Sequence, residues 1–119
     1  MYNSSTMDIQ ELTHAMHQFV TEKGWYDLDS PRPQTPKNLA LSLSIEAAEV
    51  LELFQWIEKS PDPQLLASEL ADVTLYLLQL ASVSDIDLET AVLAKLEMNY
   101  TRSWDEKYQH HEENETHEC

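Results

Sequence analysis

The sequence predicts an all-α fold, and the scarcity of glycine is the first reason. Gly24 is the only glycine among 119 residues, whereas β-sheets need tight turns and tight turns use glycine. Aliphatic, aromatic and cysteine residues make up 42% of the chain, which is enough for the core of one domain. Apolar residues recur at three- and four-residue spacing between proline-containing connections. We therefore expect an antiparallel four-helix bundle that is completed by oligomerisation.

The first two helices are predicted from their boundaries. The first is expected over residues 7–23, with Thr6 as its N-cap and Gly24 at its end. Residues 25–35 are expected to form a loop, because two prolines and two aspartates do not propagate a helix. Thr35 followed by a proline predicts the start of a second helix, which is expected to run to about Lys59.

The last two helices are predicted in the same way. Ser60 followed by Pro61 predicts a third helix over roughly residues 62–82. Its segment 73–81 is apolar nearly all round, so we expect burial on most sides and a subunit interface. Residues 84–87 are expected to cap a fourth helix that continues to about Lys107.

Residues 1–108 are expected to form the domain, followed by a disordered tail. The segment 109–119 is rich in acids and histidines and has no apolar residue except Cys119, so it cannot bury anything. With a lone cysteine there is no disulfide framework. We see no signal peptide and no apolar run of the length that spans a membrane. A cytoplasmic protein is therefore expected.

The charge balance excludes two classes of partner. Aspartate and glutamate number 22 against seven lysines and arginines, which gives a net charge of −15. Nucleic acids and anionic membranes are bound chiefly through lysine and arginine. We therefore expect neither as a partner.

Four carboxylates occupy positions where solubility does not explain them. Glu46 and Glu49 are three residues apart on the second expected helix, and Glu69 and Asp72 are three apart on the third, so each pair shares one helix face. If both faces point inward, the four acids repel one another and each costs several kcal/mol to desolvate. No lysine or arginine lies on either face, and a hard divalent cation is the physical remedy. The choice is Mg²⁺, with Mn²⁺ able to substitute, because neither face carries the histidine or cysteine that Zn²⁺ prefers.

Other interpretations of these acids remain open. Pairs of this kind are common on solvent-exposed helix faces, although here each pair is followed by an aromatic residue on the same face, Trp56 or Tyr76. A di-iron centre requires two inward Glu-x-x-His motifs, and the chain offers one, Glu11 to His14. A non-catalytic acidic helical adaptor that binds a basic partner is the alternative function. It would need no particular register of these acids.

Further motifs carry a resemblance to a known family. The acids follow the pattern E-x-x-E, 19 residues, E-x-x-D. They are accompanied by Lys37-Asn38-Leu39, by Leu53-Phe54-Gln55-Trp56, and by a K-x-x-x-N-x-x-[KR] element over residues 95–102. Over about residues 10–105 the chain is similar to the MazG-like all-α nucleoside triphosphate pyrophosphohydrolases, and within them to the dCTP pyrophosphatase branch.

The resemblance implies a reaction and a set of site residues. The reaction is Mg²⁺-dependent hydrolysis of a (deoxy)nucleoside triphosphate to the monophosphate and pyrophosphate, as housecleaning of the nucleotide pool. The implied catalytic metal ligands are Glu46, Glu49, Glu69 and Asp72. The implied phosphate or sugar contacts are Lys37, Asn38, Lys95, Asn99 and Arg102, and the implied base pocket is lined by Trp25, Trp56 and Tyr76. The family assembles as dimers or as dimer-of-dimers tetramers.

The chain departs from the family pattern in two places. The segment between Trp25 and Asn38 is longer, by the region of residues 30–33. The family's pocket histidine falls near Met16, where His17 or His14 could substitute. As proton acceptor for the attacking water we consider Glu49 or Glu52.

Overall fold

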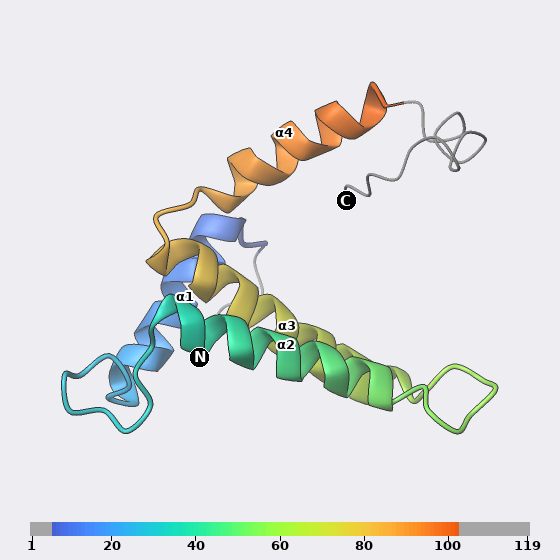
Figure 1. Cartoon of the computed structure of the whole chain (residues 1–119), viewed down its shortest axis with the longest axis horizontal. Coiled ribbons are helices and arrows are strands. Elements are labelled where there is room, and N and C mark those ends of the chain that lie inside the picture. The colour runs from blue at the N-terminus through green and yellow to red at the C-terminus, as the bar shows by residue number, and fades with distance from the viewer. Residues whose placement is uncertain (1–5, 103–119) are drawn as a thin grey trace. The chain divides into compact units, whose positions relative to one another are not determined.

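The regular elements of the computed structural model, which describes residues 6–102, are all helices (Figure 1). They are α1 (Ile9–Glu22), α2 (Pro36–Glu52), α3 (Pro63–Val83) and α4 (Leu88–Tyr100). No strand occurs within residues 6–102, so the all-α prediction is confirmed. The expected tail 109–119 and the chain beyond Arg102, including Lys107, lie outside the described residues.

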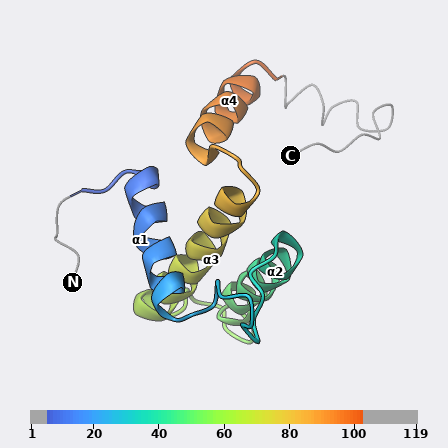
Figure 2. The same cartoon turned by 90° about the vertical axis from the view of Figure 1, so that its left-hand side faces the viewer.

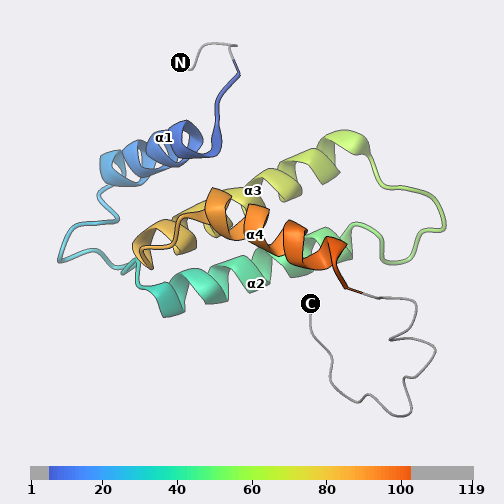
Figure 3. The same ribbon diagram turned by 90° about the horizontal axis from the view of Figure 1, so that it is seen from above.

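The chain divides into two units at the start of α4, and each is described by itself. The first unit ends at Leu88 and holds α1, α2 and α3; the second begins at Glu89 and holds α4. Within the first unit α2 and α3 run antiparallel and side by side (Figures 1 and 3). Helix α1 packs against α3 (Figure 2). The buried apolar side chains all belong to this first unit: Met16, Val20, Leu39, Leu78 and Ala81.

Helix α1 begins two residues later than expected and ends as expected. Its N-cap is Asp8, whose carboxylate accepts a hydrogen bond from the backbone N–H of Glu11 at 2.7 Å, while the Glu11 carboxylate accepts from the backbone N–H of Asp8 at 3.2 Å. The prediction of Thr6 was wrong because this reciprocal pair satisfies two helix-end donors and a threonine cap satisfies one. Gly24 follows the helix with a left-handed φ of 76°, as a helix terminator should.

Helix α2 starts where the sequence predicted and ends earlier. The Thr35 hydroxyl accepts a hydrogen bond from the backbone N–H of Asn38 at 3.2 Å, with Pro36 at the first helical position. The helix stops at Glu52, so the expected extension to Lys59 was wrong. Beyond it the backbone tightens into turns with hydrogen bonds to the third preceding residue, and Trp56 takes a left-handed φ of 71°. A residue in that conformation ends an α-helix.

Helix α3 is capped by the second of two Xaa-Pro pairs. Asp62 accepts from the backbone N–H of Gln64 at 2.8 Å and Pro63 opens the helix, whereas the sequence analysis expected Ser60 and Pro61 in these roles. Proline disfavours helical backbone in the residue before it. Asp62 accordingly has φ −53° and ψ 123° and does not continue a helix begun at Pro61.

The apolar face of α3 is only partly covered in a single chain. Leu78, Gln79 and Ala81 are buried, but Leu65, Leu70, Leu75 and Leu77 are exposed. Among the described residues α3 is the one helix with the length and mean hydropathy, 21 residues and 1.2, of a membrane span, which no segment was expected to have. Core helices of soluble proteins meet the same test. An aspartate such as Asp72 near the centre of a span costs about 3 kcal/mol.

Helix α4 ends at Tyr100, short of the expected Lys107. Its last turn is followed by Thr101 and Arg102, whose backbone N–H groups bond three residues back to Met98 and Asn99. None of the α4 residues from Leu88 to Tyr100 is fully buried. This helix carries the predicted residues Lys95, Asn99 and Arg102 next to or on its last turns.

Candidate functional site

Helices α2 and α3 bring acidic side chains together across their antiparallel contact. One carboxylate oxygen each from Glu46, Glu49 and Glu69 lies within 4.8 Å of the other two. Asp72, one turn beyond Glu69 on α3, is close enough for its charge to act on both Glu46 and Glu69. These four residues are called the carboxylate cluster below. The three-residue spacing on each helix produces the cluster, because it places both acids of a pair on one face.

The electrostatics of the carboxylate cluster are those of crowded like charges. Burial raises the pKa of the Glu46 carboxyl to about 7, and a hydrogen bond with Glu49 and the charges of Glu49, Asp72 and Glu69 add to the rise. The pKa of Glu69 is also raised, first by burial and then by Glu49, Asp72 and Glu52. Glu49 is therefore close to both Glu46 and Glu69 and contributes to the raised pKa of each. In the absence of a cation, protonation is the way this site relieves its repulsion.

The cluster has the ligand chemistry that a hard divalent cation needs. Oε2 of Glu46 and Oε2 of Glu69 are both buried and have no hydrogen-bond partner. A buried carboxylate oxygen without a partner is costly unless a cation or a donor approaches it. All donors of the cluster are carboxylate oxygens, which suit Mg²⁺ and Mn²⁺ better than Zn²⁺. These residues therefore fit a divalent cation.

A large cavity adjoins the carboxylate cluster within the first unit. Its volume is about 910 Å³, and its walls come from α1, the loop 25–35, α2 and α3. Glu46 and Asp72 line one part of it, and apolar side chains such as Leu12, Met16 and Val20 line much of the rest. A mainly apolar cavity with a few polar groups is the usual form of a small-molecule site.

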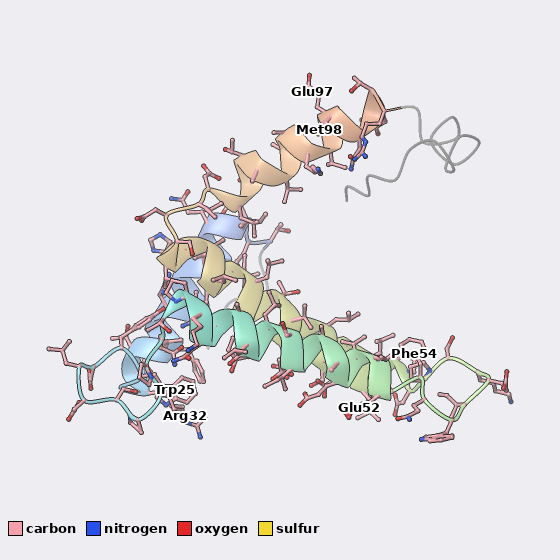
Figure 4. All side chains as sticks on the ribbon, viewed as in Figure 1. Trp25, Arg32, Glu52, Phe54, Glu97 and Met98 are labelled. Atoms are coloured by element: carbon pink, nitrogen blue, oxygen red, sulfur yellow. The ribbon has the colours of Figure 1, made fainter. Side chains whose placement is uncertain are left out.

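One wall of the cavity is aromatic and carries a positive charge. Trp25 packs edge-on against Phe19 with ring centroids 5.6 Å apart, and the Arg32 guanidinium carbon lies 5.6 Å from the Trp25 ring centroid. Figure 4 shows Trp25 and Arg32 together in the loop region, with Glu52 at the far end of α2. Arg32 is the one lysine or arginine among the residues that line the cavity. The longer segment at residues 30–33 thus supplies a cation to this wall.

The structure brings some of the sequence-predicted residues to the cavity and leaves others away from it. Trp25, Asn38 and Tyr76 line the cavity with Glu46 and Asp72. The side-chain amide of Asn38 also donates to the carbonyl of Pro33 at 2.9 Å, which ties the loop to α2. Lys37 is exposed and is not among the lining residues. Trp56 is 91% exposed on the turns after α2 and does not line the cavity.

The first-helix histidines take no part in the cavity wall, although Met16 does. Met16 is buried and lines the cavity, whereas His14 is exposed. His17 instead contacts the Tyr26 hydroxyl at 2.6 Å and the Ser82 hydroxyl at 2.7 Å. Neither histidine substitutes for the family's pocket histidine in this structure.

Four polar residues that line the cavity were not predicted from the sequence: Arg32, Gln34, Ser42 and Gln79. Gln79 is only 3% exposed and donates hydrogen bonds to Gln34 Oε1 at 2.7 Å and to the Tyr26 hydroxyl at 3.2 Å. One signal was available, because Gln79 interrupts the apolar segment 73–81 and a buried amide must find partners. No comparable local signal points to Arg32 or Gln34.

The fold and the carboxylate cluster together define a class of protein. Its members are all-α, and two antiparallel helices hold carboxylates in an arrangement that suits a divalent cation. The chain belongs to the MazG-like family, whose profile matches residues 41–118. This confirms the resemblance drawn from the motifs.

Several known proteins are similar to the chain. dCTP pyrophosphatase 1 of Homo sapiens is 39% identical over 104 residues, covering 80% of this chain and 56% of that protein. The Bos taurus dCTP pyrophosphatase 1 is 34% identical over 108 residues, covering 83% and 61%. The chain therefore spans a little more than half the length of these relatives. The crystal structure of a pyrophosphatase from Archaeoglobus fulgidus matches with a TM-score of 0.66 and 36% identity, covering 83% of this chain and 94% of that one.

Proposed function

We propose that the chain is a nucleoside triphosphate pyrophosphohydrolase. It hydrolyses (deoxy)nucleoside triphosphates, dCTP among them, to the monophosphate and pyrophosphate, and so clears unwanted nucleotides. The observation that carries the proposal is the carboxylate cluster, with two buried unpartnered oxygens, at the edge of a nucleotide-sized cavity. The printed activity of the relatives, dCTP pyrophosphatase, supports the same reaction.

The carboxylate cluster is the proposed catalytic metal centre. Glu46, Glu49, Glu69 and Asp72 would hold Mg²⁺, or Mn²⁺ in its place, through their carboxylate oxygens. When bound, the cation supplies Lewis acidity and offsets the charge of the triphosphate. The helix pair keeps the four carboxylates in register before substrate arrives, so no backbone rearrangement is needed to assemble them.

The proton acceptor for the attacking water is proposed to be Glu52 in preference to Glu49. Glu49 already shares hydrogen bonds with Glu46 and Glu69, so its oxygens are engaged within the cluster. Glu52 is exposed, lies one turn further along α2, and is near enough to raise the pKa of Glu69. An exposed carboxylate can take up a proton and release it to solvent.

The cavity wall is proposed to hold the nucleoside. Trp25 and Tyr76 offer ring faces for the base, and Arg32 offers the positive charge that a strongly acidic chain otherwise lacks at this wall. The family resemblance adds Asn38 as a sugar or phosphate contact. The resemblance also adds further contacts. Trp56 would contribute to the base pocket, and the phosphate or sugar contacts would be Lys37, Lys95, Asn99 and Arg102.

The proposed assembly is a homo-oligomer, a dimer or a dimer-of-dimers tetramer. The exposed leucines of α3 support it, because an apolar face of this kind is stabilised when a second copy covers it. The proposed location is the cytoplasm, with neither nucleic acid nor membrane as a partner. The net charge of −15 supports the last point.

The deciding experiment is pyrophosphate release from a panel of dNTPs and NTPs, with Mg²⁺ and with EDTA. We expect Mg²⁺-dependent release of pyrophosphate with the monophosphate as co-product. Release of orthophosphate would still indicate a metal-dependent phosphohydrolase, but it would contradict the proposed cleavage to monophosphate and pyrophosphate. Absence of turnover on every nucleotide would reject the enzyme and favour an acidic adaptor that binds a basic partner.

A further inference from the structure

A chain of hydrogen-bonded polar side chains reaches the cavity wall through two of its members, Gln34 and Gln79. Gln79 on α3 is at its centre and is 3% exposed. Its Nε2 donates to Gln34 Oε1 at 2.7 Å and to the Tyr26 hydroxyl at 3.2 Å, which uses both amide hydrogens. The polar atom of Gln79 that these bonds do not use is the acceptor Oε1. We call Gln79, Gln34, Tyr26, His17 and Ser82 the amide network.

The orientation of the Gln79 amide is fixed from the Gln34 side. Gln34 Nε2 donates to the backbone carbonyl of Arg32 at 2.7 Å, so Gln34 must present Oε1 to Gln79. If the Gln79 amide turned by 180°, two carbonyl oxygens would face each other at 2.7 Å. An acceptor facing an acceptor in a buried site loses a hydrogen bond and leaves both oxygens unsatisfied. Gln34 therefore holds the Nε2 of Gln79 toward itself.

The Tyr26 side accommodates the same orientation when His17 carries its proton on Nε2. His17 contacts the Tyr26 hydroxyl through Nδ1 at 2.6 Å and the Ser82 hydroxyl through Nε2 at 2.7 Å. Burial lowers the pKa of His17, so the ring is neutral at pH 7 and carries one proton. With that proton on Nε2 toward Ser82, Nδ1 accepts from the Tyr26 hydroxyl. The Tyr26 oxygen is then the acceptor that Gln79 Nε2 requires.

Asp72 of the carboxylate cluster and Gln79 of the amide network lie on one face of α3. Asp72, Tyr76 and Gln79 are at positions i, i+4 and i+7, and all three line the same cavity. Seven residues of helix separate Asp72 from Gln79 by about 10 Å along the axis. A nucleotide whose phosphates lie at the cluster therefore extends along Tyr76 toward Gln79. The part that reaches Gln79 is the edge of the base.

We infer that Gln79 is a specificity-determining residue that selects bases with an exocyclic amino group, cytosine or adenine, over uracil and thymine. Its Oε1 accepts a hydrogen bond from the amino group. The keto oxygen of uracil or thymine at the same position is a second acceptor and leaves Gln79 unsatisfied, a loss that corresponds to about tenfold in affinity. Tyr26 and Gln34 act through Gln79 as positioning residues. The inference rests on the proposed function, because it takes the nucleotide pose from it.

The test compares dCTP with dUTP, which have the same size and differ at the base edge. We expect the wild-type chain to favour dCTP in kcat/KM by about tenfold or more. Gln79→Leu should bring the ratio close to one, and Tyr26→Phe should lower it by less. In the Gln79→Leu background, Tyr26→Phe should have no further effect on the ratio, since it acts through Gln79. Gln64→Leu, the same exchange at an exposed site of α3, is the matched control and should keep the wild-type ratio.

Two outcomes would overturn the inference: a wild-type ratio near or below one, or a Gln79→Leu variant with native helix content and the wild-type ratio. If neither nucleotide is hydrolysed, the proposed function fails, and calorimetric titration with dCMP and dUMP then decides the inference separately. A dCMP preference that is lost in Gln79→Leu supports base reading without catalysis. Equal affinities overturn it.

Discussion

At one part of the cavity the carboxylates of Glu46, Glu49 and Glu69 crowd within 4.8 Å, and two buried oxygens lack partners. At the other, Gln79, Gln34 and Tyr26 form neutral hydrogen bonds in which donors meet acceptors. The first region holds like charges whose repulsion a bound cation would relieve, whereas the second is held in place by neutral hydrogen bonds that leave Gln79 Oε1 as an unused acceptor. The difference matches two tasks that the proposed nucleotide site would perform: strong electrostatic attraction, and fixed geometry for discrimination.

The largest effect on activity is expected from a change in the carboxylate cluster. Asp72→Asn should lower kcat by about a hundredfold or more and keep the helix content, because the amide offers one neutral oxygen where a cation site needs a carboxylate. Pyrophosphate release and far-UV circular dichroism measure the two quantities. Glu58→Gln, on the exposed turns before α3, is the control and should retain wild-type turnover. If Asp72→Asn retains most of its activity, the metal assignment is wrong.

The next largest effect is expected on thermal stability when Mg²⁺ is added. Millimolar Mg²⁺ should raise the melting temperature by several degrees, because a cation that binds only the folded state stabilises it by about 2.7 kcal/mol at a hundred times its Kd. NaCl at matched ionic strength should not reproduce the shift, and neither should Mg²⁺ added to Asp72→Asn. Equal shifts of the melting temperature with Mg²⁺ and NaCl would show that both act by screening charge, and would contradict a specific cation site at the carboxylate cluster.

Arg32, which lines the cavity beside Trp25, should affect substrate binding more than turnover. Arg32→Ala removes the one cation that lines the cavity. We expect KM for a nucleoside triphosphate to rise by about tenfold, or about 1.4 kcal/mol, with kcat nearly unchanged. Arg32→Lys should recover part of the loss, since the charge returns without the flat guanidinium that lies over the Trp25 ring. An unchanged KM in Arg32→Ala would show that the residue only packs against Trp25.

The smallest effect is expected in the amide network and depends on pH. Burial lowers the pKa of His17 in the folded chain below its ordinary value of 6.5. Below pH 6.5 the unfolded chain therefore binds more protons than the folded chain, and the His17 contribution to stability declines as the pH falls. The unfolding free energy of wild type, measured by urea titration, should exceed that of His17→Gln at pH 7.5, and this gap should narrow by less than about 1 kcal/mol at pH 5.5. A gap that widens toward acid pH would contradict a neutral His17.

The two regions also differ in how far the sequence predicts them. The carboxylate cluster follows from local spacing, because E-x-x-E and E-x-x-D fix the helix face and a short connection makes the two helices antiparallel neighbours. The amide network joins residues far apart in sequence: Gln34 and Gln79 have a sequence separation of 45, and His17 and Ser82 one of 65. No periodicity encodes such pairs. The lone glutamine in an apolar segment signals only that partners must exist.

The helix boundaries show a similar limit. Thr35 with Pro36 is an isolated cap signal, and the structure uses it. Around α3 two Xaa-Pro signals compete, and the restriction that Pro63 places on Asp62 decides between them. The end of α2 has no glycine or proline to mark it, and a left-handed Trp56 does not follow from residue type.

The position of the aromatic wall depends on the backbone conformation of Gly24. Its φ of 76° is strained for any other residue, and a Cβ there would lie 3.2 Å from Asp27 Oδ2. The turn at Gly24 starts the loop that carries both Trp25 and Arg32. The only glycine of the chain thus lies at the turn that begins this loop. We expect Gly24 to tolerate fewer replacements than its neighbours in a saturation library. Anyone who wishes to reshape the pocket by grafting a new loop should join it after this residue.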